Sequence, residues 1–327
     1  MIITQTPFRI SFFGGGTDYP GYFEKYGSGA VLGTAIHHSA YLSVSRFYSR
    51  LFDYSIRIAY RQVECVRSLD EIKHAPFREC LRRCGITSDV EINYTGELPS
   101  FSGLGSSSSF VVGLLNALHA FQHRSISAVD LAREAIEMEQ DTLGESVGCQ
   151  DQAFAALGGF NVIEFRPRRE IVVNRVPLST ERLEEFEQHL LLFHTGIKRR
   201  ADEIAASQIK RIGNNLDTLR RMHQMVEEGY RILTSGRSLA EFGCLLDQAW
   251  TLKTSLDQSI SNSEIQAMYQ DGKDAGAIGG KLLGAGGGGC LLFFAPPEKH
   301  AGLRERLSRL VEIPLRINAP GSRIIHA

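Results

Sequence analysis

The sequence lacks the features that mark several common protein classes. No run of apolar residues is long enough to span a membrane. Residues 1–7 have neither the basic nor the apolar region of a signal peptide. The formal net charge is −1 over 327 residues, so no basic excess favours nucleic acid or anionic lipid. We therefore expect a cytoplasmic protein without a membrane or nucleic-acid partner.

Two kinds of binding motif are also missing. The six cysteines include no Cys-x-x-Cys pair, and no second ligand pair accompanies Cys80 and Cys84 near His74, so the sequence does not predict zinc. The Walker A string, which ends in Gly-Lys-Ser or Gly-Lys-Thr, does not occur. A phosphate site in this chain must therefore be built without the Walker lysine.

Glycine, by contrast, is abundant, with 32 residues gathered in clusters. The remaining composition, 43% hydrophobic and 22% charged, is that of an ordinary globular protein, and the length allows two domains. Because glycine lets the backbone approach another group closely, the clusters indicate where the chain meets a ligand or packs tightly.

The most informative cluster is residues 97–110, Glu-Leu-Pro-Ser-Phe-Ser-Gly-Leu-Gly-Ser-Ser-Ser-Ser-Phe. An alternating segment, 90–94, precedes it and an apolar helical pattern, 110–121, follows. A strand, a glycine turn and a helix start in this order form an anion site, because the first helical N–H groups are free. We interpret the loop as a nucleotide phosphate cradle; the alternative is a helix that a serine simply caps.

A second glycine segment lies at residues 7–18, Pro-Phe-Arg-Ile-Ser-Phe-Phe-Gly-Gly-Gly-Thr-Asp. Arg9 could bind an oxyanion through two parallel hydrogen bonds, and Asp18 could accept from sugar hydroxyls. The alternative is a strand that enters a tight turn, with Asp18 as a cap.

A third glycine segment, residues 281–290, contains Gly-x-Gly-x-x-Gly at 284–289. The dinucleotide fingerprint must follow a strand and open a helix. Here we expect a helical segment before the glycines and a strand, 291–295, after them, so a dinucleotide oxidoreductase is rejected. The alternative is close packing of the start of the strand against a neighbouring element.

Two acidic residues, Glu139 and Asp151, are candidates for magnesium binding and for a carboxylate that positions or deprotonates an acceptor hydroxyl. Glu137 and Asp141 lie nearby, and we expect both to be solvated. Spacing alone does not select Glu139 and Asp151.

The pattern along the chain predicts an α+β protein in two parts that meet near residue 185. The polar stretch 180–188 is interpreted as a linker. Helices are expected at 69–84, 106–122, 127–141, 149–156, 200–234, 237–256, 262–276 and 297–310. Strands or hairpins are expected at 2–13, 30–47, 51–66, 87–95, 158–176, 190–195, 291–295 and 312–317.

The three glycine segments, in this order, resemble the motifs of the GHMP small-molecule kinases, and the resemblance covers nearly the whole chain. It implies a two-domain fold: residues 1–185 would resemble the second domain of ribosomal protein S5, and residues 186–327 would be ferredoxin-like. ATP would lie over the serine-rich loop, and a small-molecule sugar would lie between the domains. A homodimer is also expected.

The motif match implies roles for individual residues. Asp151 matches the carboxylate assigned as catalytic base in galactokinase-like members. Arg9 and Asp18 would hold the acceptor and steady the transferred group. Ser107 and Glu139 would coordinate Mg²⁺. The residues expected at the ATP phosphates are Pro99, Ser102, Gly103, Leu104, Gly105, Ser106, Ser107 and Ser108. Further residues expected at the substrate are Gly15, Gly16, Thr17, Gly286, Gly287, Lys198 and Arg199, with Arg200 as another candidate for a distal phosphate.

Residues 8–20, 147–154 and 195–201 look most like the bacterial branch that phosphorylates D-glycero-D-manno-heptose 7-phosphate at C1. The resemblance thus implies an ATP- and magnesium-dependent sugar 1-kinase that supplies heptose nucleotides for surface polysaccharide, either capsule or lipopolysaccharide. Cys149-Gln150 stand where galactokinases carry Gly-Ile-Met, which argues against galactose. The alternatives are a kinase for mannose, fucose or galactose, and a non-catalytic relative that binds nucleotide or sugar.

Overall fold

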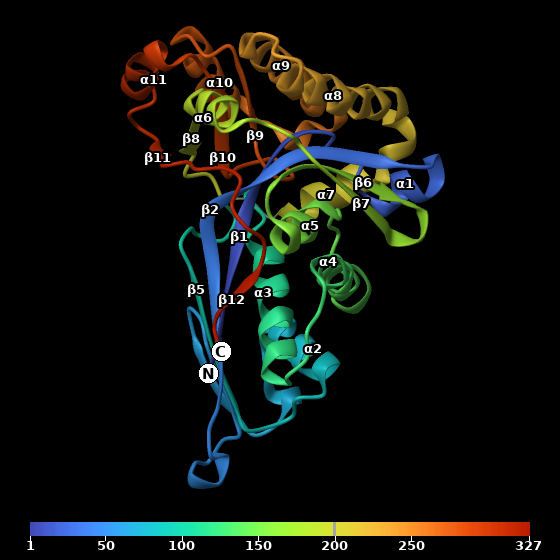
Figure 1. The fold of residues 1–327 in the computed structure, drawn as a ribbon, viewed down its shortest axis with the longest axis vertical. Coiled ribbons are helices and arrows are strands. Elements are labelled where there is room, and N and C mark those ends of the chain that lie inside the picture. Colours follow the sequence, from blue (N-terminus) through green and yellow to red (C-terminus); the bar gives the residue numbers. More distant parts are fainter. Residues whose placement is uncertain (199–200) are drawn as a thin grey trace.

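A computed structural model describes residues 1–198 and 201–327 of the chain. The molecule is elongated, with a long sheet in its lower and middle parts and the helices of the later chain at the top (Figure 1). In this part of the chain no helix is both long enough and apolar enough to cross a membrane.

The first sheet is built around one very long strand, β2. This strand pairs with β1 along most of its length, with β6 through its first part and with β5 through its last part. The sheet order is β12-β1-β2-β5-β3-β4, with β6 on β2 and β7 on β6. Its strands are β1 (Ile2–Phe13), β2 (Gly29–Arg46), β3 (Ile56–Ala59), β4 (Val63–Val66), β5 (Val90–Gly96), β6 (Phe160–Arg166), β7 (Glu170–Arg175) and β12 (Arg323–His326).

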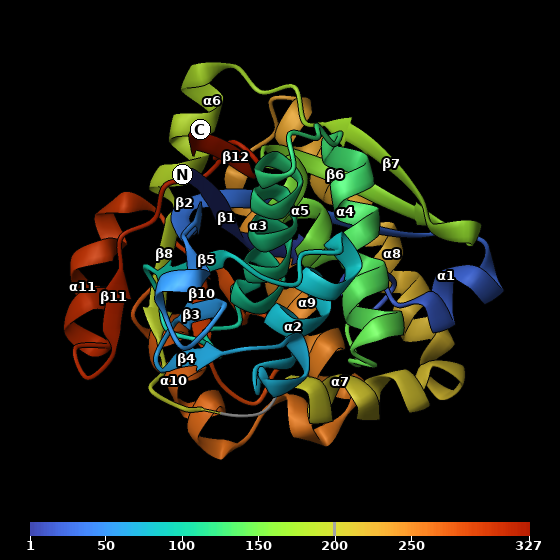
Figure 2. The same ribbon diagram turned by 90° about the horizontal axis from the view of Figure 1, so that it is seen from below.

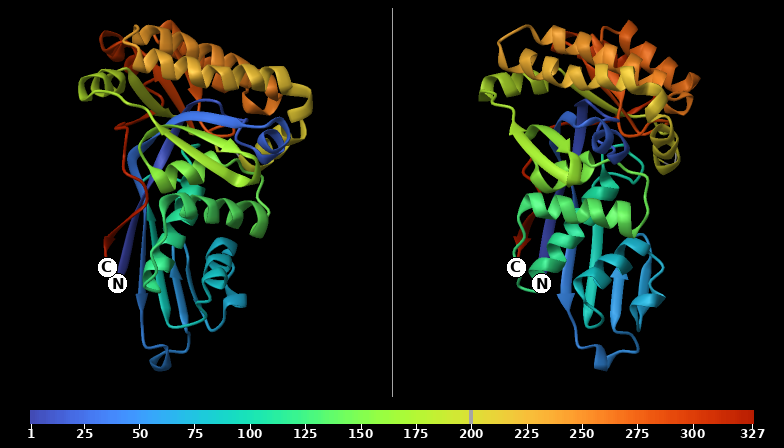
Figure 3. Two further views of the ribbon diagram at one scale, coloured as in Figure 1. Left: turned by 45° about the vertical axis from the view of Figure 1, so that its right-hand side comes forward. Right: turned by 90° about the vertical axis from the view of Figure 1, so that its right-hand side faces the viewer.

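Helices cover one face of the lower part of this sheet, and α3 packs on both β1 and β2 (Figures 2 and 3). The apolar run that predicts α3 explains its place, because every residue from Ser108 to Leu118 except Asn116 is buried. The helices of the first half are α1 (Pro20–Tyr26), α2 (Ala75–Cys84), α3 (Ser106–Phe121), α4 (Ala128–Glu137) and α5 (Gln150–Leu157).

The second sheet is antiparallel, in the order β11-β8-β10-β9. Along the chain, one strand is followed by several helices, then by two strands, a helix and the last strand. With the sheet order, this is the predicted ferredoxin-like arrangement with extra helices in its first crossover. The strands are β8 (Leu190–His194), β9 (Gly279–Leu282), β10 (Cys290–Phe294) and β11 (Val311–Ile313). The helices are α6 (Thr180–Gln188), α7 (Ala201–Lys210), α8 (Leu216–Thr234), α9 (Leu239–Leu256), α10 (Ser263–Asp274) and α11 (His300–Arg306).

Short turns of other helix types complete the chain. Within the described residues, six are 3₁₀ turns, and η3 is a π-helical turn that follows α4 directly. They are η1 (Ser49–Leu51), η2 (Leu69–Glu71), η3 (Met138–Thr142), η4 (Pro167–Arg169), η5 (Ile212–Asn215), η6 (Gln258–Ile260) and η7 (Pro297–Lys299).

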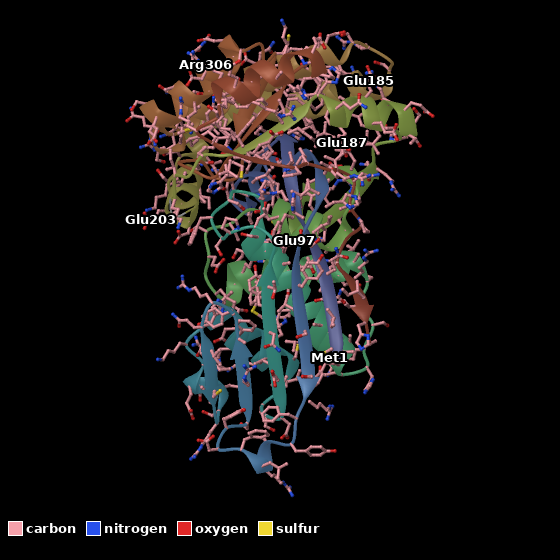
Figure 4. All side chains as sticks on the ribbon, turned by 90° about the vertical axis from the view of Figure 1, so that its left-hand side faces the viewer. Met1, Glu97, Glu185, Glu187, Glu203 and Arg306 are labelled. Carbon is pink, nitrogen blue, oxygen red and sulfur yellow. The ribbon has the colours of Figure 1, made fainter. Side chains whose placement is uncertain are left out.

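After the second sheet, the chain returns to the first. The Ile317 N–H donates to the Glu187 carboxylate at 2.8 Å, and Figure 4 shows Glu187 in the upper part of the molecule, well above Met1. Strand β12 then pairs with β1, so both chain ends lie side by side (Figure 1). The division at 185/186 stays a prediction; it falls within α6, and the last strand of the second part belongs to the first sheet.

The two parts share a core of aromatic rings. Phe12 of β1 contacts Phe160, Phe186 and Phe242, with ring centroids 5.4–5.6 Å apart. Phe294 of β10 joins the same cluster through Phe186 and Phe242. Because these rings come from both sheets and from α6 and α9, the parts are packed into one body.

Several expected elements are wrong in detail. The predicted linker 180–188 is helix α6, which Ser179 caps by accepting from the Arg182 N–H and which buries Phe186. The predicted helix 200–234 is divided into α7 and α8 by η5. The segment directly before the third glycine cluster is strand β9 rather than a helix, and the expected strand 312–317 is the shorter β11.

Candidate active site

The three glycine segments meet at one place, where the end of β9 approaches the start of α3. The Arg9 N–H donates to the Leu104 carbonyl at 3.0 Å, which joins the first segment to the second. A methyl group on Gly284 would lie 2.8 Å from the Gly103 Cα, so only glycines allow the second and third segments to touch. Segments far apart in sequence thus form a single surface.

The start of α3 presents free backbone N–H groups at this surface. Gly105, in the left-handed region at φ 77°, precedes the helix, and no side chain of the described residues caps it. The serines lie inside the first turn, so the alternative that a serine caps the helix is not supported. Uncapped N–H groups and the helix dipole attract anions, which agrees with a phosphate cradle.

Arg9 and Asp151 form a bidentate ion pair beside this helix start. Arg9 Nε donates to Asp151 Oδ1 at 2.8 Å and Nη2 donates to Oδ2 at 2.7 Å. The remaining Nη1 donates to the Gly103 carbonyl at 2.7 Å. The Arg9 side chain is 4% exposed but that of Asp151 is 28% exposed. The arginine therefore fixes a carboxylate that stays open on one side.

Asp18 is fully buried next to this pair. Its two carboxylate oxygens accept from the Gly16 N–H at 3.0 Å and the Gln150 N–H at 3.3 Å. Burial and, second, the charge of Asp151 raise the pKa of Asp18. A methyl group on Gly148 would lie 2.0 Å from Asp18 Oδ2, which explains the glycine there.

Glu139, on the π-helical turn η3, is also fully buried. Its Oε2 accepts from the Ser108 hydroxyl at 2.9 Å and from Gln152 Nε2. Burial, followed by the charge of Glu145, raises the pKa of Glu139 to about 8. Its Oε1 has no hydrogen-bond partner among the described residues. A buried carboxylate oxygen without a partner fits a site that a cation completes.

The fit to magnesium rests on few protein ligands. Among residues 1–198 and 201–327, no three His, Cys, Asp or Glu side chains gather as a metal cluster. Magnesium in kinases typically takes one or two carboxylates and completes its shell with water and substrate phosphates, so Glu139 fits this role. Ser107, expected as the second ligand, is exposed on the first turn of α3, whereas its neighbour Ser108 contacts Glu139.

The other residues expected at the substrate lie in different surroundings. The Thr17 hydroxyl is buried and donates to the Gly14 carbonyl at 2.7 Å, so it serves the turn. Gly286 and Gly287 pack against Ile260. Lys198 is exposed, while Arg199 and Arg200 lie outside the described residues.

The remaining predicted residues of the first two segments differ in their surroundings. Gly16 borders a small pocket of about 10 Å³ that Tyr19, Gln208 and Asn215 also line. Gly15 is close to Gln150, Ser102 is buried without a hydrogen-bond partner among the described residues, and Pro99 is exposed. A larger, open hollow of about 490 Å³ lies elsewhere, and none of the predicted residues line it. It is lined by Arg306 of α11, which Figure 4 labels at the top of the molecule.

Sequence reasoning missed three buried side chains at the site. Gln152 contacts Glu139, and two lysines, Lys253 and Lys281, approach from the second half of the chain. Lys281 begins the third glycine segment, which was a signal of its position. Lys253 lies in a helix with no motif around it, and nothing in the sequence distinguishes it from a solvated lysine.

Comparison with known proteins identifies the family. The GHMP kinases N terminal domain matches residues 71–159, and the GHMP kinases C terminal domain matches residues 230–312. The chain is also 31% identical over 323 residues to the D-glycero-alpha-D-manno-heptose 7-phosphate kinase of Campylobacter jejuni, covering 94% of this chain and 93% of the relative. The chain belongs to the GHMP kinases.

Two further GHMP kinase matches differ in what they cover. A crystal structure of a D-glycero-D-manno-heptose 1-phosphate kinase from Bacteroides thetaiotaomicron has a TM-score of 0.82 at 22% identity, over 100% of this chain and 99% of that chain, which shows the shared fold. The bifunctional fucokinase/GDP-fucose pyrophosphorylase of Arabidopsis thaliana is 27% identical over 96% of this chain, which spans 32% of that longer protein.

These matches confirm the predicted family, its two-domain α+β fold and the enzyme class. This GHMP kinase is an ATP-dependent phosphotransferase that acts on a hydroxyl group. The roles of the individual site residues remain predictions.

Proposed function

We propose that this GHMP kinase transfers phosphate from ATP to the anomeric C1 hydroxyl of D-glycero-D-manno-heptose 7-phosphate, giving the 1,7-bisphosphate. The observation that carries the reaction type is the Asp151 carboxylate, fixed by Arg9 beside the uncapped start of α3. The choice of sugar is supported by the 31% identity to the Campylobacter jejuni kinase.

In this proposal, the N–H groups at the start of α3 bind the ATP phosphates, together with the loop of Ser102, Gly103 and Leu104. Asp151 accepts the proton of the C1 hydroxyl, or orients that hydroxyl for attack. Arg9 holds Asp151 and lies close enough to the cradle to offset charge on the transferred group.

Glu139 and Ser107 would hold magnesium, with Ser108 orienting the Glu139 carboxylate. When bound, the ion supplies positive charge that offsets the negative phosphates. Asp18, Gly15, Gly16 and Thr17 would form the wall at the sugar, and Lys198 with Arg199 would meet its distal phosphate. This last role rests on the residue types alone.

The second candidate function is a kinase for an unphosphorylated sugar. The similarity to the Arabidopsis thaliana fucokinase favours fucose among these, ahead of mannose and galactose. For either substrate, we also propose that the enzyme is cytoplasmic and forms a homodimer. If the substrate is the heptose, the enzyme would supply the synthesis of surface polysaccharide.

The test is ADP release with magnesium and ATP across a panel of acceptors. The panel contains heptose 7-phosphate, heptose 1-phosphate, sedoheptulose 7-phosphate, mannose, galactose and fucose, with phosphorus NMR to locate the new phosphate. Turnover only with heptose 7-phosphate and a product phosphate on C1 supports the proposal. Turnover with heptose 1-phosphate or with a free sugar alone would overturn the assigned acceptor and the role of Lys198 and Arg199.

A further inference from the structure

Lys253 is a charged side chain buried at the junction of the two halves. It lies in the last turn of α9, which runs alongside β9 at the top of the molecule (Figure 1). Its Nζ donates to the Leu282 carbonyl at 3.3 Å and also to the Gly284 carbonyl. The side chain therefore binds the first turn of the third glycine segment through two backbone carbonyls.

The ammonium group has no ion-pair partner among the described carboxylates, although charged residues of the site lie near enough to affect its pKa. Burial is the main cause that lowers the pKa of Lys253 to about 8, so the group is still mostly charged at neutral pH. The charges of Arg9, Asp18 and Asp151 also act on it. A buried cation without a close counter-ion is costly, which argues against a purely structural role that an apolar side chain could fill.

The turn that Lys253 binds is connected to the proposed catalytic residues by a series of contacts. Gly284 is pressed against Gly103, whose carbonyl accepts from Arg9, and Arg9 holds Asp151. Lys281, which directly precedes Leu282 in the same strand, donates from Nζ to the Phe12 carbonyl at 2.8 Å and so ties β9 to β1. A chain of contacts thus runs from α9 to Asp151 through both glycine loops.

We infer that Lys253 is a positioning residue for phosphoryl transfer: its ammonium group holds the Gly284 turn against Gly103, so that the ATP phosphate cradle is completed by the second half of the chain. This inference deepens the proposed function and rests on it. It assigns to α9 a part in nucleotide binding, although α9 itself contributes no residue to the glycine segments.

The test compares Lys253→Met with a matched lysine. Lys273 donates from Nζ to the Ile278 carbonyl, just before the same strand, but pairs with Asp247 away from the glycine loops. Lys273→Met should therefore cost stability without changing ATP affinity. We expect Lys253→Met to raise the Kd for ATP and the KM for ATP about tenfold or more, with the KM for the sugar unchanged. Lys253→Arg, which keeps the charge, should recover part of the loss.

A second variant tests the same contact without removing the lysine. Gly284→Ala places a methyl group against Gly103 and should weaken ATP binding like Lys253→Met, which keeps the inference testable if the latter does not fold. ATP binding by calorimetry and the melting temperature are measured for each variant. Equal losses of ATP affinity in Lys253→Met and Lys273→Met would overturn the role of Lys253 but not the proposed function. No loss of ATP affinity in Lys253→Met and Gly284→Ala would have the same meaning. A wild-type protein that binds no ATP would overturn the proposed function as well.

Discussion

The Asp151 carboxylate is bound on one side by Arg9 and open on the other, which is the geometry that a proposed proton acceptor needs. We predict that Asp151→Asn lowers kcat about 10²- to 10⁴-fold, because an amide cannot take the proton. ATP affinity should stay close to that of the wild type, since the helix start that binds the phosphates is unchanged. Turnover assays and calorimetric ATP titrations check both parts.

A suitable control is Asp141→Asn. Asp141 lies near Asp151 in the sequence and also pairs with an arginine, Arg169. Its side chain, however, is 56% exposed. This variant should retain full turnover. Nearly full turnover in Asp151→Asn would remove Asp151 from the reaction.

Glu139 should make the stability of the protein depend on pH. Because burial raises its pKa from 4.5 to about 8, the folded protein holds this proton more tightly than the unfolded chain does. The resulting stabilisation is complete below the pKa that Glu139 has in the unfolded chain. It is lost as the pH rises through the pKa that Glu139 has in the folded protein. Glu139→Gln does not titrate, so we predict that it becomes more stable than the wild type by a few kcal/mol at about pH 8.

Urea unfolding of the wild type and Glu139→Gln between about pH 5 and about pH 8 measures this effect. Magnesium with ATP should narrow the difference at high pH, because the ion binds the deprotonated carboxylate. Parallel pH curves for the two proteins would show that Glu139 is charged in the fold.

Among single residues, those within motifs could be placed from the sequence and those outside could not. Arg9, Asp18 and Asp151 were predicted to act together, and the structure brings them together. Lys253 could not be predicted, because a lysine in an amphipathic helix is normally solvated. Only the packing of α9 on β9 turns it inward.

At the scale of elements, one substitution at the start of α3 should change the stability of the fold and the affinity for ATP in opposite directions. Ser107 lies exposed in its first turn, and an acidic residue there is favourable for the helix dipole. We predict that Ser107→Asp stabilises the fold by about 0.3–1 kcal/mol. In the absence of magnesium, which the new carboxylate could otherwise bind, the same charge should repel the ATP phosphates and weaken ATP binding about tenfold or more.

The melting temperature of Ser107→Asp and its titration with ATP in the absence of magnesium test this opposition, with Ser107→Asn as the uncharged control. If ATP binds Ser107→Asp as tightly as the wild type, the phosphates do not lie at this helix start.

Elements with strong periodic patterns were predicted well, and those made by tertiary contact were not. The apolar runs of α3 and β10 gave the right element at nearly the right bounds. Strand β9 begins with two glycines, which disfavour strands, and it forms because β10 and α9 enclose it. Helix α6 looked like a linker because only a few of its residues, Phe186 among them, face the core.

For the whole molecule, the shared aromatic cluster predicts that both halves unfold together. Phe12→Ala removes a fully buried ring from β1 and should destabilise the protein by about 3–5 kcal/mol. Trp250, the single tryptophan, lies in α9 in the other half, and its fluorescence should report the same shift as far-UV circular dichroism.

Denaturant titrations of Phe12→Ala followed by both signals measure this coupling. Phe52→Ala removes a ring that is 52% exposed, far from the cluster, and should leave both transitions in place. A Trp250 transition that does not move in Phe12→Ala would mean that the halves unfold separately.

The pairing of β12 with β1 sets Ile3 opposite His326, so the two ends of the chain are neighbours on adjacent strands. A short peptide could therefore join them, and the resulting ring could be reopened at the exposed turn around Gly236, between α8 and α9. In such a circular permutant, the third glycine segment would be synthesised before the first. Since the three segments meet only through folded contacts, the order in which the ribosome delivers them would be immaterial to the finished site.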